Sequence, residues 1–292
     1  MFSSLIFKQK LKQGSQFLTG FLLLFLTSCT SLFFQPDRIL YSNPSKYNFK
    51  PEVIYFDSKD QTKLLGWYFK PKEKKIKGTI IQFHGNSQNI SSQSLSLLWL
   101  IKHGYALFTF DYRGYGGSEG EPNIDDVIED GIAGIKQGLL LHKKNSPKSP
   151  LILIGQSLGG ALVMKSAELF GFEKINPSLI VLDSTFYSYQ QVASGNLQQK
   201  WWTWIIHPFS YILVSDKYET SESLKKYKGK LLVIHDEEDP IVPFENGNEL
   251  FYLSKSKEKE FWELKNTPHI GVFSIKKNRT LFLDYLKRLN HK

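Results

Sequence analysis

The chain has little of what metal or redox chemistry requires. It contains one cysteine, Cys29, which cannot form an intrachain disulfide, and it lacks the Cys-x-x-Cys and His-x-x-x-His spacings typical of zinc sites. It also lacks Gly-x-x-x-x-Gly-Lys and Gly-x-Gly-x-x-Gly, the sequences of loops that bind nucleotide phosphates. We therefore expect neither a metal nor a cofactor.

Long low-complexity tracts are absent, and so is a concentrated basic segment. With 41% hydrophobic and 22% charged residues among 292, the chain can build a core and is neither disordered nor fibrous. The formal net charge is +9, but the lysines fall in short clusters without the aromatic interleaving or recognition helix of nucleic-acid-binding proteins. We expect no nucleic-acid partner, whereas a mild attraction to anionic membranes is compatible with the charge.

The amino terminus has the layout of a secretory signal. Three lysines at positions 8 to 12 precede an apolar run at 17–26, and small residues follow it. A helix that crosses a bilayer needs roughly 20 apolar residues, so a ten-residue run is too short for a stable transmembrane anchor.

The single cysteine gives this signal a more specific interpretation. The sequence Leu-Thr-Ser-Cys that ends at Cys29 resembles the lipobox of bacterial lipoproteins, which implies lipidation of Cys29 and removal of residues 1–28. Residues 29–50, which are polar, would then be a tether. The resemblance implies a lipid-anchored protein of the bacterial cell envelope. With Thr30 rather than Asp in second place, it implies the outer membrane if the organism has one.

From residue 51 onward, short apolar runs alternate with helical patterns. The runs expected to be strands are 53–56, 64–69, 79–83, 106–110, 151–154, 179–182, 231–234 and 261–264. The central runs are apolar throughout, as in parallel strands covered on both faces, whereas the first two alternate more and fit an antiparallel edge.

Helices are expected between these strands. Apolar residues recur at steps of three and four from Ile124 to Leu139, behind Asn123 as a cap. Further helices follow Ser157 and occupy the carboxyl-terminal end. The order βαβα predicts an α/β fold with a mostly parallel sheet and helices on both faces.

One insertion interrupts this order, at about 186–226. It is rich in tyrosine and tryptophan and follows the carboxyl end of a strand, where an open sheet binds its ligands. We expect a small cap, whose aromatic residues either pack on one another or line a ligand pocket.

Two segments have the spacing Gly-x-Ser-x-Gly of a nucleophile elbow. Ser157 directly follows the apolar run 151–154 and opens a helical pattern, which is the strand–turn–helix that the elbow requires. Ser118 lies in a glycine-rich loop that runs into Pro122 and lacks both flanks. The sequence therefore favours Ser157 as the nucleophile and Ser118 as part of a loop.

A serine hydroxyl needs a base, and the base needs an acid that orients it. Four acids follow the strand at 231–234, and of these Asp239 lies furthest along the loop. Among seven histidines, His269 alone combines a loop after a strand, the chain order Ser, acid, His, and a position before the last helix.

Taken together, these motifs are similar to those of a known family. The motifs are His-Gly-Asn at 84–86, Asp-Tyr-Arg-Gly-Tyr-Gly at 111–116, the elbow at Ser157, Asp239 before Val242-Pro243, and His269. On these residues, 51–292 resembles the α/β-hydrolase superfamily, and in particular its bacterial serine esterases and lipase-like members.

The resemblance implies roles for individual residues. Ser157 would be the nucleophile, His269 the general base and then acid, and Asp239 its orienting partner, with an oxyanion hole made by the backbone N–H groups of Asn86 and Leu158. Two positions depart from the family pattern, since Asp236 follows His235 where glycine is frequent and Pro268 precedes His269. The first departure leaves Asp236 and Glu238 as alternative acids.

The sequence supports three functions to different degrees. We expect a membrane-anchored serine hydrolase acting on a small-molecule or lipid ester or thioester. A serine peptidase or amidase could use the same triad, and a non-catalytic envelope protein could use the same fold for binding.

Overall fold

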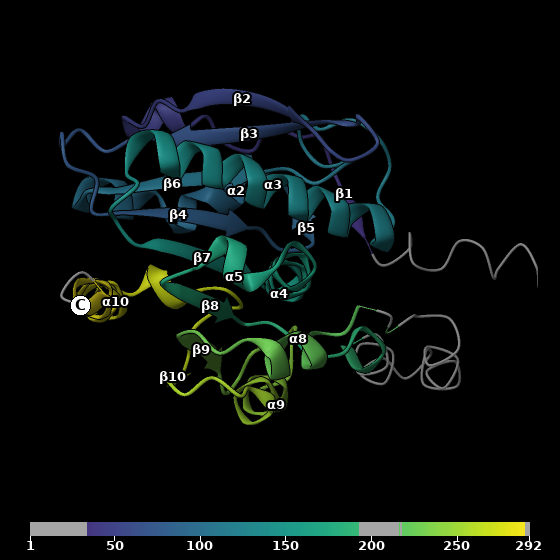
Figure 1. The fold of residues 1–292 in the computed structure, drawn as a ribbon. Coiled ribbons are helices and arrows are strands. Elements are labelled where there is room, and N and C mark those ends of the chain that lie inside the picture. Colours follow the sequence, from purple (N-terminus) through teal and green to yellow (C-terminus); the bar gives the residue numbers. More distant parts are fainter. Residues whose placement is uncertain (1–33, 193–215, 217, 290–292) are drawn as a thin grey trace, which may run out of the picture.

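A computed structural model describes residues 34–192, 216 and 218–289, and these residues build one large sheet (Figure 1). The sheet has eight strands in the order β10-β9-β8-β7-β4-β6-β3-β2. They are β2 (Glu52–Asp57), β3 (Lys63–Phe69), β4 (Gly78–Phe83), β6 (Tyr105–Phe110), β7 (Leu151–Gln156), β8 (Leu179–Asp183), β9 (Leu231–Asp236) and β10 (Lys259–Leu264). All eight strands predicted from the sequence are confirmed, each to within two residues at either end.

Strand direction also follows the hydrophobic pattern. Strands β4, β6, β7, β8, β9 and β10 are parallel to their neighbours in this group, and the residues of β4, β6, β7, β8 and β9 are buried throughout. Strand β2 pairs antiparallel with β3, and β3 pairs antiparallel with β6. The expected antiparallel edge is therefore confirmed. It exposes one face, as the alternating pattern of β2 requires.

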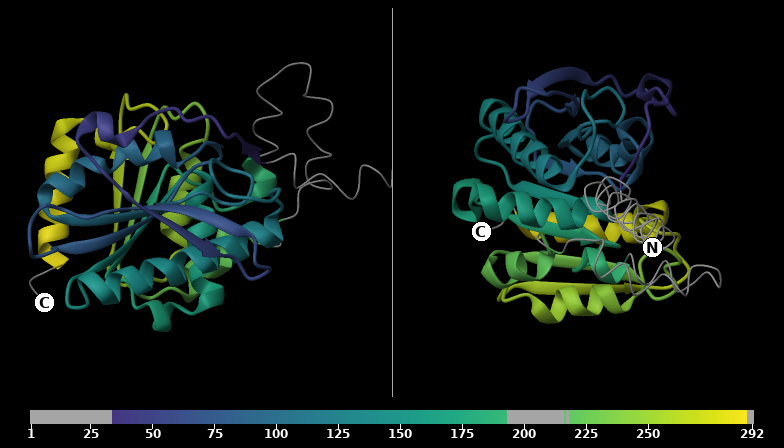
Figure 2. Two further views of the ribbon diagram at one scale, coloured as in Figure 1. Left: turned by 90° about the horizontal axis from the view of Figure 1, so that it is seen from above. Right: turned by 90° about the vertical axis from the view of Figure 1, so that its right-hand side faces the viewer.

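Helices cover both faces of the sheet (Figures 1 and 2). One face packs against α3 (Ile124–Asn145), α4 (Leu158–Phe170), α8 (Thr220–Lys226) and α9 (Glu245–Leu253); the other packs against α10 (Lys276–Leu289) and the 3-10 helices η3 (Ser94–Ser96), η4 (Leu98–His103) and η6 (Val272–Ser274). Alternate residues of one strand serve the two cores: Ile81 of β4 lies in the first and Ile80 in the second. The fold is an α/β fold with a mostly parallel sheet and helices on both faces, as predicted.

The predicted crossover helix begins where its cap was expected. The side-chain oxygen of Asn123 accepts a hydrogen bond of 3.0 Å from the N–H of Asp126, which satisfies one of the first helical donors. Asp125 and Asp126 lie in the first turn, where the helix dipole favours negative charge.

The segment predicted as a tether lies against the domain in its described part. Residue Phe34 is 5% exposed and belongs to the core of one face. Strand β1 (Gln35–Pro36) then pairs with β5 (Ser87–Gln88), a second and smaller sheet that the sequence did not indicate. The 3-10 helix η2 (Pro44–Tyr47) leads from there to β2.

Several predictions fall on residues outside the described part of the chain. They are the signal at 1–28, Cys29, and most of the aromatic insertion, of which 193–215 and 217 are not described. The short helices α2 (Ile90–Gln93), α5 (Phe172–Ile175) and α9 had no counterpart in the prediction. No helix within the described ranges is long and apolar enough to span a bilayer.

Candidate active site

Ser157 forms a sharp turn between β7 and α4. Its backbone has φ 52° and ψ −123°, a strained conformation for a residue with a side chain and the one expected of a nucleophile elbow. The turn brings α4 so close to β4 that a Cβ atom on Gly159 would collide with the carbonyl oxygens of Phe83 and His84. The glycine at this position of the motif is therefore required by packing.

Asp239 and His269 form a hydrogen-bonded pair on the loops after β9 and β10. Asp239 Oδ2 lies 2.7 Å from His269 Nδ1, and the carboxylate is fully buried. Its other oxygen accepts the N–H groups of Ile241 and Val242, at 2.8 and 3.0 Å. Burial raises the pKa of Asp239, but these hydrogen bonds, that from His269 first, outweigh it, so the net pKa is below its usual value. Asp239 is thus ionised at neutral pH.

The two alternative acids occupy other positions. Asp236 Oδ2 accepts both the N–H and the hydroxyl of Thr267, at 2.7 and 2.6 Å, while its other oxygen accepts the N–H of Glu238. Asp236 therefore fixes the start of the loop that carries His269, without a hydrogen bond to the imidazole itself. Glu238 is exposed.

Pro268 begins a tight turn that presents His269. The N–H of Gly271 donates to the carbonyl of Pro268 at 2.7 Å, and Ile270 adopts φ 53° within the turn. The N–H of Ile270 donates to Ser184 Oγ at 3.3 Å, which ties the turn to the end of β8. The departure at Pro268 is thus accommodated by a defined turn.

The end of β8 connects the serine to the histidine loop. The N–H of Ser157 donates to the carbonyl of Asp183 at 2.9 Å, and the next residue, Ser184, accepts from Ile270. Asp183 is buried and accepts a hydrogen bond of 2.9 Å from Gln156 Nε2. Burial raises the pKa of Asp183 to about 6, and the nearby His269 opposes the rise.

Asp183 was missed by sequence reasoning. Its only signal was its place as the last residue of an apolar strand, at the edge where the site residues gather.

Of the two predicted oxyanion donors, Leu158 lies within the elbow turn and Asn86 lies on the loop after β4. Leu158 is the first residue of α4, where an N–H has no acceptor within the helix. Asn86 follows β4, and a Cβ atom added at its neighbour Gly85 would lie 3.4 Å from Ser157 Cβ. The loop that carries Asn86 therefore runs directly beside the serine.

The second Gly-x-Ser-x-Gly segment is a loop, as predicted. The buried hydroxyl of Ser118 donates to the carbonyl of Asp111 at 2.7 Å and accepts the N–H of Leu65 at 2.9 Å. Asp111 accepts N–H groups of Ile90 and Gly117, and burial raises its pKa to about 7. This arrangement braces the loops beside the sheet and presents no serine to solvent.

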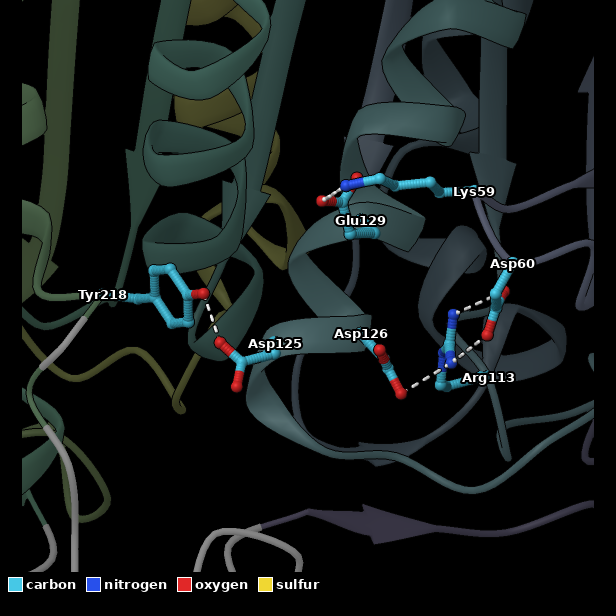
Figure 3. A pocket seen from close by; sticks show the side chains of 7 residues that line it. All are labelled: Lys59, Asp60, Arg113, Asp125, Asp126, Glu129 and Tyr218. Carbon is cyan, nitrogen blue, oxygen red and sulfur yellow. Dashed lines mark hydrogen bonds and ion pairs between the residues drawn. The ribbon is translucent and has the colours of Figure 1, made fainter.

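A cavity of about 350 Å³ lies at the start of α3 (Figure 3). Its lining is mostly ionic: Lys59, Asp60, Arg113, Asp125, Asp126, Glu129 and Tyr218. These groups pair with one another, as in Lys59–Glu129 at 2.8 Å, Arg113–Asp60 at 3.0 Å, and the hydrogen bond from Tyr218 to Asp125. The side chains that line the cavity thus bind one another and connect the loop after β2 to the start of α3. The described residues contain no group of three or more His, Cys, Asp or Glu side chains that could hold a metal ion.

Comparison with protein families gives one match that covers half of the chain. The family model described as serine aminopeptidase, S33, matches residues 74–221, a span that includes Asn86, Ser157 and Leu158. YfhR of Escherichia coli (strain K12), an uncharacterized protein, is 30% identical over 249 residues, which cover 84% of this chain and 81% of YfhR.

Two further proteins similar to this chain have names that state an activity. The lysophosphatidylserine lipase ABHD12 of Mus musculus is 27% identical over 198 residues, or 60% of this chain and 45% of that protein. Among solved structures, the esterase Pf2001 of Pyrococcus furiosus has a TM-score of 0.69 at 22% identity, covering 88% of this chain and 97% of that one. At that identity the structural likeness speaks for the fold alone.

Proposed function

This chain belongs to the serine aminopeptidase S33 family, and we propose that it is a membrane-anchored enzyme that cleaves a carboxylic ester or thioester. It is a hydrolase of the α/β-hydrolase, esterase and lipase type. In the proposed reaction, cleavage proceeds through an acyl-enzyme at Ser157. The observation that carries the proposal is the 2.7 Å contact of Asp239 with His269 Nδ1, on loops beside a strained serine elbow. Support for membrane attachment comes from the sequence around Cys29.

In the first half of the reaction, the two ring nitrogens of His269 have different roles. An ionised Asp239 accepts a hydrogen bond from the Nδ1–H group of His269, so Nε2 is the nitrogen that can take a proton. As Ser157 Oγ attacks the carbonyl carbon, its proton moves to Nε2 of His269. The new C–O bond turns the carbonyl oxygen into an oxyanion, which the N–H groups of Leu158 and Asn86 stabilise.

The second half releases the two products. His269 gives its proton to the leaving alcohol or thiol as the bond to the acyl carbon breaks, which leaves an ester on Ser157. Water then attacks this ester as His269 takes its proton; His269 returns the proton to Ser157 Oγ as the acyl–serine bond breaks, and the carboxylic acid is released. A metal or cofactor has no part in these steps.

A fluorophosphonate probe tests the serine chemistry. Attack by an activated serine displaces fluoride and leaves a stable phosphonyl ester, so the native protein should be labelled and Ser157→Ala should not. Ser118→Ala is the matched control, and it should label like the parent chain. Absence of labelling in the native protein would contradict the proposal and favour a non-catalytic binding protein.

The substrate class needs a separate experiment. A relative named as a lysophosphatidylserine lipase supports an acyl lipid, whereas the name serine aminopeptidase supports the alternative of a peptidase or amidase. Turnover of p-nitrophenyl esters of increasing chain length should exceed turnover of aminoacyl anilides. A preference for the anilides would replace the esterase proposal with the peptidase one.

Membrane attachment is tested at Cys29. Lipidation with more than one acyl chain gives stable anchoring, because each buried CH₂ contributes about 0.8 kcal/mol. Cys29→Ser should therefore move the protein from the membrane fraction to the soluble fraction. Unchanged membrane retention of Cys29→Ser would contradict lipidation as the anchor.

A further inference from the structure

Residues 34–41, which we call the N-terminal strap, cross the loop that follows β4. Strand β1 of the strap runs parallel to β5, with Gln35 opposite Ser87 (Figure 1). Phe34, at the start of the strap, is 5% exposed and belongs to the same buried cluster as Leu158. A segment that precedes the domain in the sequence is therefore packed into the core of one sheet face and paired with the strand that follows Asn86.

The strap contacts Asn86 directly. The backbone N–H of Gln35 donates to Asn86 Oδ1 at 3.0 Å, and the hydroxyl of Tyr115 donates to the same oxygen at 2.7 Å. The N–H of Gln35 also lies 3.2 Å from the Tyr115 hydroxyl, which closes a triangle of three polar groups. An amide oxygen accepts two hydrogen bonds, so these two donors fix the orientation of the Asn86 side chain.

The rest of the strap is bound to neighbouring loops. The carbonyl of Asp37 accepts the N–H of Gly116 at 2.8 Å, and its carboxylate accepts Asn89 Nδ2 at 3.0 Å. Asn89 Nδ2 also donates to the carbonyl of Ile39 at 2.8 Å. The strap is thus bonded along its length to the loop that contains Asn86 and Asn89 and to the loop that contains Gly116.

Gln93 of α2 holds the same loop from the other side. Its Oε1 accepts the N–H of Gly85 at 2.7 Å, and its Nε2 donates to the carbonyl of Ser87. Asn86 lies between these two residues, so the backbone on either side of it is bonded to Gln93 while its side chain is bonded to the strap. A donor that must meet an oxyanion needs this degree of fixation, within about 0.5 Å.

We propose that the N-terminal strap and Tyr115, from the loop after β6, together position the oxyanion hole by fixing Asn86 through the N–H of Gln35 and the hydroxyl of Tyr115. This inference rests on the proposed function, in which the Asn86 N–H stabilises the oxyanion. Neither Gln35 nor Tyr115 touches the reacting atoms. Losing an oxyanion donor typically costs about 10² to 10³ in rate, so a displaced donor should cost about 10 to 10².

The full chain allows a matched pair of variants. Gln35→Pro removes the backbone N–H, while Gln35→Ala keeps it and changes only an exposed side chain. We expect kcat for p-nitrophenyl acetate to be at least ten-fold lower in Gln35→Pro than in Gln35→Ala, with KM nearly equal. Inhibition by an alkylboronic acid, whose tetrahedral adduct occupies the oxyanion hole, should weaken by the same factor, and the apparent pKa in kcat/KM should not move.

Tyr115→Phe provides a second test that keeps the packed ring. It removes the other donor to Asn86, and it decides the question if Gln35→Pro fails to fold in a thermal melt. A fall of five-fold or more in kcat together with weaker boronic acid binding supports the strap proposal. Equal kcat within each comparison, or a lower kcat with unchanged boronic acid binding, overturns it. A parent chain that neither labels nor hydrolyses any ester overturns the proposed function and the strap role together, a result visible before any variant is made.

Discussion

Ser157 and Ser118 occupy the same five-residue spacing but lie in different local structures. Ser157 ends a buried parallel strand, adopts a strained backbone and opens a helix, whereas Ser118 lies in a loop with its hydroxyl bonded to Asp111 and Leu65. The glycines differ too. Gly159, the last glycine of its motif, allows a helix to meet the carboxyl end of β4, whereas Gly117, the residue before Ser118, faces the flexible side chain of Leu65. A short motif therefore specifies chemistry only when its flanks supply a strand before it and a helix after it.

The largest expected effect is on the rate of hydrolysis. Ser157→Ala should lower kcat by about 10⁴ or more, because it removes the nucleophile, and it should leave the thermal midpoint close to that of the parent chain. Ser118→Ala should keep kcat within about three-fold but lower the free energy of unfolding by about 1–3 kcal/mol, since the buried N–H of Leu65 loses its acceptor. Ester kinetics and chemical denaturation of both variants measure this. A Ser118→Ala variant that is inactive but of normal stability would contradict the assignment of Ser118 to loop structure.

The next effect concerns His269, the proposed base for Ser157. Asp239→Asn keeps the shape of the side chain but loses the carboxylate that holds the proton on His269 Nδ1, so kcat should fall by about 10³ to 10⁴. Asp236→Asn is the matched control, because Asp236 bonds Thr267 and not the imidazole. Stopped assays at pH 7.5 should show Asp236→Asn closer to the parent. The reverse order would assign the orienting role to Asp236.

A smaller effect, on the free energy of unfolding, is expected from adding one methyl group to a glycine near each of the two serines. Gly159→Ala places a Cβ against backbone carbonyl oxygens that cannot move independently, and it should destabilise the fold by roughly 3 kcal/mol or more. Gly117→Ala meets the end of the Leu65 side chain, which can rotate, so its cost should be about 1 kcal/mol. Urea denaturation of the two variants compares them. Equal stability losses would show that the two turns are packed alike.

The last effect is a pH dependence in the Ser118 loop, which appears only when stability is compared across pH. Asp111 has a pKa of about 7 in the folded protein, raised by burial above its ordinary value of 3.8. The folded state therefore binds its proton more tightly than the unfolded chain. The stability that this gives is complete at acid pH and is lost as pH rises from about 4 to about 7.

Asp111→Asn removes this titration and tests its sign. Relative to the parent chain, the variant should gain free energy of unfolding as pH increases from 4 to 8, by an amount of order a few kcal/mol. Other titrating groups are common to both chains and cancel in the difference, except His84, whose Nε2 lies 3.7 Å from Asp111 Oδ1 and whose pKa is lowered by burial to about 4, at the acid end of this range. A difference that is flat across this range would mean that Asp111 does not carry the proton.

Much of this molecule can be read from the sequence because its signals are local. The eight strands follow from apolar runs, the cap at Asn123 from one polar residue before a periodic segment, and the elbow from a strand that meets a helix. The choice of Asp239 over Asp236 and Glu238 rested on loop position, and the structure places Asp239 against His269.

What the sequence could not show depends on residues that are far apart in the chain. Asp183 lies near His269 because β8 ends between β7 and β9, an arrangement that no spacing within the chain reveals. Gln35 bonds Asn86 through its backbone N–H, which every residue except proline carries, so its identity gives no signal. The polar composition of residues 29–50 predicts a tether for the same reason, because amino-acid composition carries no sign of hydrogen bonds made by the backbone.

The N-terminal strap changes the residue at which a truncated recombinant form of this domain can begin. The family resemblance places the start of the domain at residue 51, and a recombinant chain begun there would lose Phe34 from the core and β1 from the small sheet. Such a truncation would expose apolar surface and the unpaired edge of β5, both of which favour aggregation during purification. A soluble form of the enzyme should therefore begin no later than Phe34, with any affinity tag separated from it by a spacer.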